Sequence, residues 1–332
     1  MYQRKQMILM VILAAALSLV FKGEIRAENY RNGQDVDAIY QDIRNSGTAY
    51  EWDETIVSFE NEGMTVVCSL TIPRTPQLVP IAITLNGFTG DRNDVPVPGT
   101  VEPFFKRVAR IMAEQGIATL RVDFRGSGDS DGEFQMTTFS TQISDAIAAV
   151  NYIEGNLEHK VKSKSIGILG FSQGGLVGSC TAARDRRVDS LVLWSAPAHA
   201  PHDYEGLITK EGIQAGLALL DGGYDMFPLY VLGQFIYEVP LGKGFFEDLF
   251  RVSAITELKD YDKPMMYIAG TQDIIVWPQP IIGETFIKYH KGDEKLVVLD
   301  AGHDFLGLDN PGKMDDAVYW SIAWFISTLK TK

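Results

Sequence analysis

The segment that most constrains the fold of this chain is residues 165–180, which read SIGILGFSQGGLVGSC. The run Ser165–Leu169 has the length and composition of a buried strand, and the small residues from Leu176 to Cys180 favour a helix. Between them, the glycines of Gly170-Phe171-Ser172-Gln173-Gly174 leave room for a tight turn. A strand that enters a helix through so short a turn predicts a parallel α/β sheet, with Ser172 raised above the end of its strand.

Beyond this segment, strand-like and helix-like runs alternate along the chain. Three β-rich runs come first, at 55–59, 64–72 and 81–85. Later strands are expected at Ile117–Val122, Val188–Trp194, Pro264–Ala269 and Leu296–Leu299, and helices at Val101–Gln115, Ser140–Glu154, Pro280–Tyr289 and Lys313–Leu329. The alternation predicts an α/β fold with a mostly parallel central sheet flanked by helices. Because 45% of the 332 residues are hydrophobic, we expect one large core. We place this core in a single domain over residues 55–330, which follows a leader segment at 28–54.

One stretch, residues 198–256, interrupts the alternation. It contains no convincing sheet strand but many aromatic residues, namely Tyr204, Tyr224, Phe227, Tyr230, Phe235, Tyr237, Phe245, Phe246 and Phe250. An insertion of this length inside a repeating fold is usually functional, and we predict a lid over the site. The alternative is a helical hairpin that only extends the core.

The first 27 residues differ in character from the rest. Arg4 and Lys5 precede an uncharged apolar run from Met7 to Phe21, and Ala27 ends a short charged stretch. This order is typical of a secretory signal peptide. The run is shorter than the roughly 20 residues of a membrane-spanning helix. We therefore expect cleavage near Ala27 and a secreted or periplasmic protein, with a retained membrane anchor and a buried core helix as the alternatives.

Charge and cysteine content exclude several kinds of partner. The formal charge is −13, and loss of residues 1–27, which hold four basic residues and one acidic residue, makes it −16. We therefore expect no binding to nucleic acid and no stable association with membranes after signal cleavage. Cys68 lies in a predicted strand and Cys180 in a predicted helix, so we expect two buried free thiols rather than a disulfide or a metal site.

Ser172 needs two partners in order to act as a nucleophile. A serine hydroxyl requires a histidine to take its proton and a carboxylate to orient that histidine. After such a turn, the partners follow the serine in the order acid, then histidine. Asp273 comes directly after the predicted strand at 264–269, and His303 comes just after the strand at 296–299. Loops at the carboxyl ends of parallel strands point into a site, so we predict Ser172, Asp273 and His303 as a catalytic triad.

Other residues fit these roles less well. Asp300 and Asp304 are close to His303 in the sequence, but neither follows the preceding strand, and adjacency does not orient an imidazole. The remaining histidines lie before the strand at 165–169, at the start of the insertion or at a helix end: His159, His199, His202 and His290. The plain alternatives for Ser172 and Asp273 are a glycine-rich loop and a turn aspartate.

An acyl-transfer site also needs hydrogen-bond donors for the negative charge that develops on the substrate oxygen. Gln173, the residue after the serine, would supply one backbone N–H. The loop after the third β-rich run reads Asn86-Gly87-Phe88-Thr89-Gly90, and its glycines would let the N–H of Phe88 face the site. We predict an oxyanion hole made by Phe88 and Gln173, and a plain glycine turn at 86–90 is the alternative.

Together these motifs resemble the α/β-hydrolase superfamily and, more narrowly, the bacterial cinnamoyl or feruloyl esterases. The resemblance covers roughly residues 55–330, and its most specific part is the stretch DFRGSGDSDG at 123–132. In such esterases the phenylalanine of an H-G-F-T-G loop and the residue after the serine form the oxyanion hole, which matches Phe88 and Gln173. Asn86 and Phe171 stand where the family usually has histidine, and these departures bear on the substrate more than on the reaction.

The resemblance implies a serine hydrolase that cleaves carboxylic esters through an acyl-enzyme on Ser172, and the predicted signal peptide implies that it is secreted. Hydroxycinnamoyl esters, such as feruloylated plant polysaccharide fragments, are one implied substrate class. The expected partner is therefore a small-molecule or oligosaccharide ester, and no cofactor or metal is implied. An exopeptidase or acyl-thioesterase with the same triad, and a non-catalytic binding protein with the same fold, are the alternatives.

Overall fold

The computed structural model describes residues 35–45, 47, 49–94, 96–306 and 312–329. The predicted signal peptide at 1–27 lies outside this part of the chain. Within the described ranges, no helix combines the length and the apolar character that a membrane span requires.

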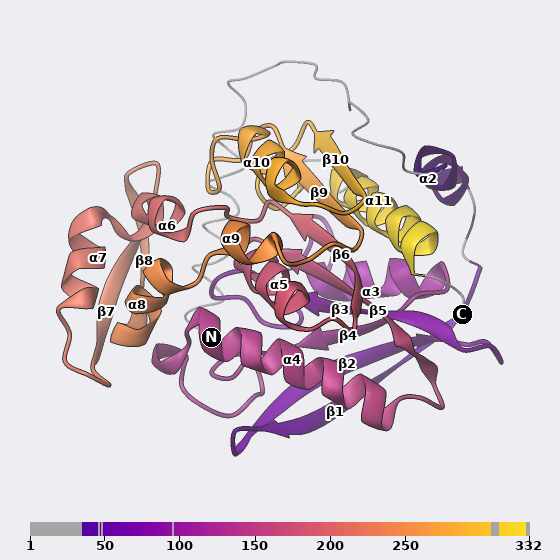
Figure 1. The fold of residues 1–332 in the computed structure, drawn as a ribbon, viewed down its shortest axis with the longest axis horizontal. Helices are drawn as coiled ribbons and strands as arrows, with labels where there is room; N and C mark the ends of the chain where they lie inside the picture. Colours follow the sequence, from indigo (N-terminus) through magenta and orange to yellow (C-terminus); the bar gives the residue numbers. More distant parts are fainter. Residues whose placement is uncertain (1–34, 46, 48, 95, 307–311, 330–332) are drawn as a thin grey trace.

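An eight-stranded sheet forms the centre of the molecule (Figure 1). In spatial order its strands are β1 (Trp52–Asn61), β2 (Met64–Pro73), β4 (Ala118–Val122), β3 (Val79–Leu85), β5 (Val161–Phe171), β6 (Val188–Trp194), β9 (Met265–Gly270) and β10 (Glu294–Leu299). Strand β2 runs antiparallel to both of its neighbours, and all pairs from β4 to β10 are parallel. The predicted mostly parallel central sheet is confirmed.

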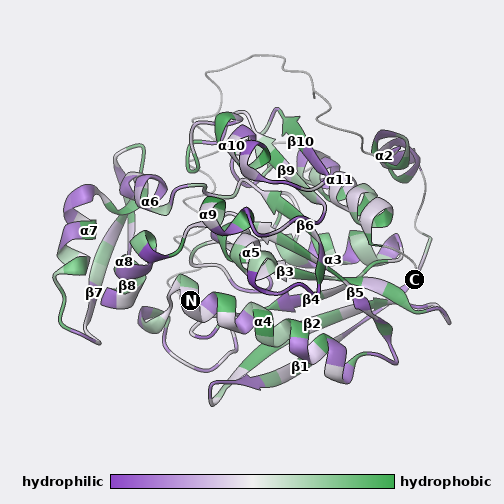
Figure 2. Cartoon of the chain, in the orientation of Figure 1, coloured by the Kyte–Doolittle hydropathy of each residue, from purple (hydrophilic) through white to green (hydrophobic). Residues whose placement is uncertain are grey.

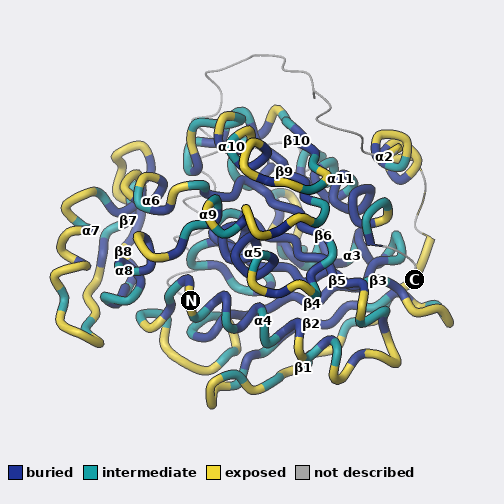
Figure 3. Tube along the Cα trace, viewed as in Figure 1, coloured by how far each residue is buried: buried dark blue, intermediate teal, exposed yellow. Residues whose placement is uncertain are grey.

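Helices form two groups beside the sheet, and each group shares one hydrophobic cluster with it. The first group is α2 (Val36–Asn45), α3 (Phe104–Glu114) and α11 (Gly312–Thr328), and the second is α4 (Phe139–Asn156), α5 (Gln173–Arg184), α9 (Ala254–Leu258) and α10 (Ile281–Tyr289). Because neighbouring side chains of a strand point to opposite faces, Ala82 of β3 joins the first cluster and Ile83 joins the second. The central strands are mostly hydrophobic in Figure 2 and buried in Figure 3. Each strand and helix predicted from the alternation is present, with ends shifted by at most a few residues.

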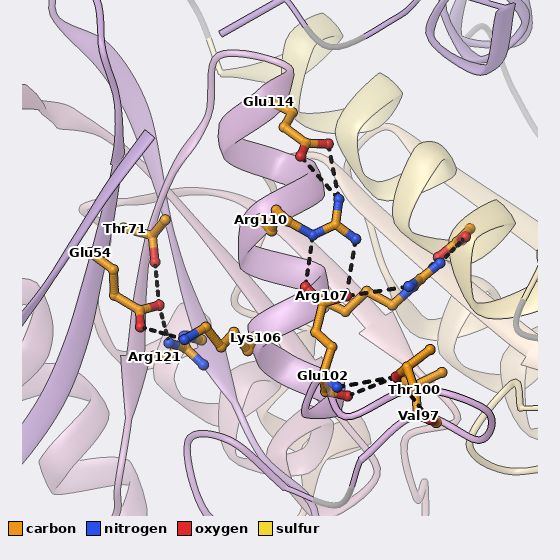
Figure 4. A network of polar contacts seen from close by, with 11 residues as sticks. Glu54, Thr71, Val97, Thr100, Glu102, Lys106, Arg107, Arg110, Glu114 and Arg121 are labelled. Carbon is orange, nitrogen blue, oxygen red and sulfur yellow. Dashed lines mark hydrogen bonds and ion pairs between the residues drawn. The ribbon is translucent and has the colours of Figure 1, made fainter. Parts of the chain in front are cut away.

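Ion pairs fasten α3 and β4 to the elements beside them (Figure 4). Arg107 of α3 donates two hydrogen bonds of 2.7 Å to Asp315 of α11 and also contacts Glu102. Arg121 of β4 is fully buried and pairs with Glu54 of β1. The first contact joins α11 to α3, and the second joins the antiparallel edge strand β1 to β4.

Part of the predicted leader segment packs onto the domain. Tyr40 of α2 stacks on Trp320 of α11 with ring centroids 4.0 Å apart, and its hydroxyl donates to Asp316 at 3.1 Å. Strand β1 begins at Trp52, slightly before the predicted domain start at residue 55. The two cysteines are buried free thiols, as predicted.

The insertion at 198–256 forms a lobe at one end of the molecule, on the left in Figure 1. The lobe contains α6 (Ala200–Ile208), α7 (Lys210–Leu217), β7 (Tyr224–Val231), β8 (Gln234–Gly242) and α8 (Lys243–Arg251), and the insertion then runs into α9 beside α5. The expectation that it holds no strand is wrong, because β7 and β8 pair as an antiparallel hairpin in a sheet of their own.

Two sequence features concealed this hairpin. Pro228 and Pro240 lie inside its strands, and proline counts against a strand because it has no N–H for the ladder. Both strands of a two-stranded sheet are edges, where proline is tolerated. The turn residues Leu232 and Gly233 have φ values of 50° and 76°, and this type of turn usually has asparagine or aspartate before the glycine.

Candidate active site

Ser172 lies on the turn between β5 and α5. Its backbone has φ 52° and ψ −123°, a conformation that residues other than glycine rarely adopt, and its N–H donates to the carbonyl oxygen of Trp194 at 2.8 Å. Glycines make the turn possible. A Cβ on Gly170 would lie 2.3 Å from the oxygen of Gly174, and a Cβ on Gly174 would lie 2.2 Å from the oxygen of Leu85. The serine hydroxyl is thereby held at the carboxyl end of a central strand.

Two hydrogen bonds connect Ser172, His303 and Asp273. The distance from Ser172 Oγ to His303 Nε2 is 2.9 Å, and the distance from His303 Nδ1 to Asp273 Oδ2 is 2.8 Å. The three residues follow β5, β10 and β9, so three segments far apart in the sequence meet at the carboxyl ends of parallel strands. This arrangement matches the relation of nucleophile, base and acid in a serine hydrolase.

Asp273 is buried, and the chain holds its carboxylate from two sides. Oδ1 accepts the backbone N–H groups of Ile275 and Val276 at 2.8 and 2.9 Å, while Oδ2 faces His303. Burial by itself lowers the pKa of His303, but the charge of Asp273 and its hydrogen bond outweigh burial. The pKa of His303 is therefore raised above its ordinary value of 6.5.

The two alternative acids have other partners. Asp300 is exposed and accepts a hydrogen bond of 2.7 Å from the side chain of Gln272. Asp304 accepts a backbone N–H two residues further on, and burial raises its pKa to about 6. The carboxylate that meets the imidazole of His303 is that of Asp273.

The loop at 86–90 lies against Ser172. A Cβ on Gly87 would be 3.3 Å from the Cβ of Ser172 and 3.4 Å from the ring of Phe171, so glycine allows this close approach. The N–H of Gly90 donates to the oxygen of Gly87 at 3.1 Å and closes the loop. Phe88, one of the two expected oxyanion donors, therefore lies on a tight turn beside the serine.

Gln173, the other expected donor, is the first residue of α5. The N–H groups in the first turn of a helix have no partner within the helix. The same end of the helix carries the positive part of its dipole. Both properties suit a donor to the negatively charged oxygen of a reaction intermediate.

The two positions that depart from the esterase pattern support the site through packing. Asn86 is buried and donates from Nδ2 to the oxygen of Gly87 at 3.1 Å. The ring of Phe171 has its centroid 5.1 Å from that of His303 and 5.4 Å from that of Phe104. The loop and the imidazole are thus supported here by side chains that do not titrate.

The stretch 123–132 contacts the chain just after the loop that carries Phe88. Asp123 is fully buried, accepts the backbone N–H groups of Arg92 at 2.6 Å and Asp129 at 2.8 Å, and forms an ion pair with Arg92. Gly128 leaves room for this carboxylate, because a Cβ there would lie 2.0 Å from Asp123 Oδ2. Since Arg92 lies two residues after the loop at 86–90, the ion pair ties that loop to the end of β4.

The sequence did not predict three polar contacts around the expected oxyanion hole. Gln173 donates from Nε2 to Gln142 Oε1 at 2.8 Å and accepts the hydroxyl of Tyr204 at its own Oε1. The hydroxyl of Tyr237 lies 2.8 Å from Thr89 Oγ1. No local pattern marks these residues, because each one reaches the site from an element that is distant in the sequence.

Part of the sequence matches a known family. Residues 101–221 match the family described as serine aminopeptidase, S33. An uncharacterized 31.7 kDa protein of Escherichia coli, from the traX-finO intergenic region, is 34% identical over 132 residues, which is 40% of this chain and 41% of that protein. The uncharacterized protein RP471 of Rickettsia prowazekii is 29% identical over 96 residues, which is 29% of this chain and 38% of that protein. The chain thus matches less than half of the length of these curated relatives.

Solved structures match most of the chain. Est1E from Butyrivibrio proteoclasticus, in its form with ferulic acid bound, has a TM-score of 0.63 and 24% identity, over 80% of this chain and 96% of its own. An esterase from Pyrococcus furiosus has a TM-score of 0.56 and 19% identity, over 92% of this chain and 100% of its own. A dienelactone hydrolase from Anabaena variabilis has a TM-score of 0.58 and 16% identity, over 85% of this chain and 100% of its own. Likeness at these identities shows a shared fold.

Proposed function

We propose that this chain, which has the α/β-hydrolase fold and resembles the feruloyl esterases, is a serine hydrolase that cleaves carboxylic esters through an acyl-enzyme on Ser172. The observation that carries the proposal is the hydrogen-bonded chain from Asp273 through His303 to Ser172. The strained turn under Ser172 adds support, because strained backbone persists where the surrounding structure holds a reactive side chain in place.

In the first half of the proposed reaction, Ser172 Oγ attacks the carbonyl carbon of the ester while His303 Nε2 accepts the Oγ proton. The π electrons of the carbonyl move to its oxygen, which the backbone N–H groups of Gln173 and Phe88 stabilise. When the tetrahedral intermediate collapses, the bond to the alcohol oxygen breaks, and His303 gives its proton to that oxygen. The alcohol leaves, and the acyl group remains as an ester of Ser172.

In the second half, water takes the place of the alcohol. His303 accepts a proton from the water as its oxygen attacks the acyl carbon, and the same N–H groups stabilise the second oxyanion. Collapse of this intermediate releases the carboxylic acid and returns the proton to Ser172 Oγ. Asp273 accepts the Nδ1–H of His303 throughout, so in the neutral imidazole before each attack the lone pair of Nε2 is free to accept a proton.

Hydroxycinnamoyl esters, and feruloyl esters in particular, are the substrates that we propose. One support is the structural match to Est1E with ferulic acid bound. A second is the aromatic environment of Phe88, whose ring centroid lies 5.5 Å from those of Tyr204 and Phe245 and 6.1 Å from that of Phe134. Because Tyr204 and Phe245 belong to the insertion, we propose that the insertion acts as a lid over an acyl pocket.

A peptidase activity is the second candidate, and the match to the serine aminopeptidase family favours it. The same three residues would then attack an amide instead of an ester. Turnover of p-nitrophenyl acetate, methyl ferulate, an acyl-CoA thioester and an amino acid p-nitroanilide, measured side by side, separates esterase, thioesterase and peptidase. A non-catalytic binding protein would hydrolyse none of the four.

The direct test of the nucleophile is Ser172→Ala. We expect kcat for p-nitrophenyl acetate to fall by about 10⁴-fold or more, because the remaining rate depends only on binding and on the oxyanion donors. A fluorophosphonate probe should label the wild-type peptide that contains Ser172 and leave the variant unlabelled. The matched control is Ser179→Ala, which removes a buried hydroxyl bonded within α5 to Gly175 at 2.8 Å and should leave turnover unchanged. Retention of more than about a tenth of kcat in Ser172→Ala would show that another group is the nucleophile.

We also propose that the protein is exported and that residues 1–27 are removed. The support is the order of charged and apolar residues in that segment. The mass of the protein recovered from the periplasm or the medium tests this proposal, because cleavage near Ala27 leaves a mature chain that begins close to residue 28. An intact Met1 terminus on membrane-bound protein would favour a retained anchor.

A further inference from the structure

The insertion reaches Gln173, one of the two expected oxyanion donors, through a buried hydrogen bond. The hydroxyl of Tyr204 on α6 donates to Gln173 Oε1, and Gln173 Nε2 donates to Gln142 Oε1 on α4 at 2.8 Å. The three side chains are each at most 3% exposed. Burial raises the pKa of Tyr204 well above its usual value, so the phenol stays protonated and able to donate.

These two bonds hold both ends of the Gln173 amide. A flipped amide would place its oxygen against Gln142 Oε1, where two acceptors would face each other. With Gln142 presenting its Oε1 as it does here, the side chain of Gln173 has one favourable orientation. Because its backbone N–H is at the start of α5, beside Ser172, a fixed side chain also restrains the direction of that N–H.

The insertion also holds the loop that carries Phe88, the other expected donor. The ring of Phe88 meets Tyr204 edge to face, with centroids 5.5 Å apart, and stacks on Phe245 at 5.5 Å. The next residue, Thr89, has a left-handed backbone with φ 63°, and its Oγ1 lies 2.8 Å from the hydroxyl of Tyr237, a buried residue of β8. A hydrogen bond at a strained residue helps to keep the loop in a conformation that it would otherwise leave.

We propose that Tyr204 and Tyr237 are positioning residues for the oxyanion hole, so that the insertion determines the rate of acyl transfer as well as the choice of substrate. This inference rests on the proposed function, because it assigns the backbone N–H groups of Gln173 and Phe88 to the oxyanion. Each phenol hydroxyl acts through one hydrogen bond, to the Gln173 side chain or to Thr89. Neither tyrosine needs to touch the substrate.

A purely structural role for these tyrosines leads to a different expectation. Phenylalanine preserves the ring packing of both residues, so Tyr204→Phe and Tyr237→Phe remove only the hydroxyl contacts. If those hydroxyls serve stability alone, the variants unfold more easily but retain wild-type kinetics once folded. If they orient the N–H donors, the transition state loses stabilisation while binding of the ground state stays the same.

The experiment measures both variants on p-nitrophenyl acetate, a substrate too small to depend on a lid. We expect kcat to fall on the order of 10-fold with little change in KM, which is less than the 10²–10³-fold cost of losing an oxyanion donor altogether. The inhibition constant of an alkyl trifluoromethyl ketone should weaken by the same factor, because its serine adduct carries the oxyanion. Melting temperatures show whether each variant is folded, and Tyr237→Phe tests the inference even where Tyr204→Phe does not fold.

The control is Tyr261→Phe. Tyr261 is also buried, at 3% exposed, and its hydroxyl bonds to the carbonyl oxygen of Pro264. The Tyr261→Phe variant should have the kcat and the inhibition constant of the wild type. Two results would overturn the inference, given a wild type that hydrolyses the ester. In the first, both folded variants keep the kcat and the inhibitor affinity of the wild type. In the second, kcat falls without any loss of inhibitor affinity. A wild type without turnover would instead refute the proposed function itself.

Discussion

Replacement of Asp273 by asparagine should stop proton transfer while leaving the fold intact, and the structure gives the reason. Asp273 Oδ1 accepts two backbone N–H groups, from Ile275 and Val276, at 2.8 and 2.9 Å. An amide at this position must keep its oxygen toward those two donors, so its NH₂ group faces His303. The amide then donates to Nδ1 of His303, and the imidazole proton moves to Nε2, where it points at Ser172 Oγ 2.9 Å away. A protonated Nε2 cannot accept the serine proton.

The size of the effect follows from this loss of the base. Loss of the correct tautomer in a serine hydrolase lowers kcat on the order of 10⁴-fold, or about 5.4 kcal/mol in the activation free energy. The two backbone hydrogen bonds to residue 273 remain, so the melting temperature of Asp273→Asn should stay close to that of the wild type. Hydroxide can replace the missing base, so the residual rate should rise with pH above neutral.

The assay is kcat for p-nitrophenyl acetate between pH 6 and 10, beside Asp300→Asn and Asp304→Asn. Both of these variants should lose far less activity, because neither carboxylate contacts the imidazole in the way that Asp273 does. A larger loss in Asp304→Asn than in Asp273→Asn would refute the assignment of the acid. A loss of less than about tenfold in folded Asp273→Asn would refute the argument from the tautomer.

Three further predictions concern pH, the turn and the insertion. The rate kcat/KM should fall as pH falls through the pKa of His303, because imidazolium cannot accept a proton, and the midpoint should lie above 6.5 because Asp273 raises that pKa. The charge of Asp304 also raises the pKa of His303, so Asp304→Asn should move the midpoint of the pH profile to lower pH, while Asp300→Asn should leave it in place. An unchanged midpoint in Asp304→Asn would contradict this reasoning. Gly174→Ala would bring a methyl group within 2.2 Å of a backbone oxygen of β3, and urea unfolding should show a loss of about 3 kcal/mol; a variant as stable as the wild type would show that the turn can relax. Replacement of residues 198–256 by a glycine-serine link should lower kcat/KM for methyl ferulate more than for a short acetate ester, and equal losses in a variant shown to be folded by circular dichroism would refute the lid.

The structure sharpens that last experiment. Tyr204, Phe245 and Phe246 of the insertion are buried in the same cluster as Phe139 of α4. The insertion therefore extends the main core as well as covering part of it, and its removal exposes apolar surface. For this reason the single hydroxyl deletions at Tyr204 and Tyr237 separate chemistry from folding more cleanly than the excision does.

The sequence by itself determined the strands of the central sheet, the helices that alternate with them and the positions of Ser172, Asp273 and His303. These features depend on local physics, because apolar periodicity marks each element and the glycines at 170 and 174 are required where a Cβ would meet backbone atoms. Loops after parallel strands meet at one edge of the sheet, so the strand that each residue follows was enough to predict that the three would come together.

Only the tertiary structure decided which side chains surround Ser172, Asp273 and His303. Tyr204 meets Gln173 across 31 residues of sequence, and Tyr237 meets Thr89 across 148. Such contacts depend on where the insertion folds back onto the sheet, which no local pattern encodes. The β7–β8 hairpin has the same origin, since its prolines are acceptable because both strands are edges of a two-stranded sheet. Its Leu232-Gly233 turn lacks the asparagine or aspartate that would mark it in the sequence.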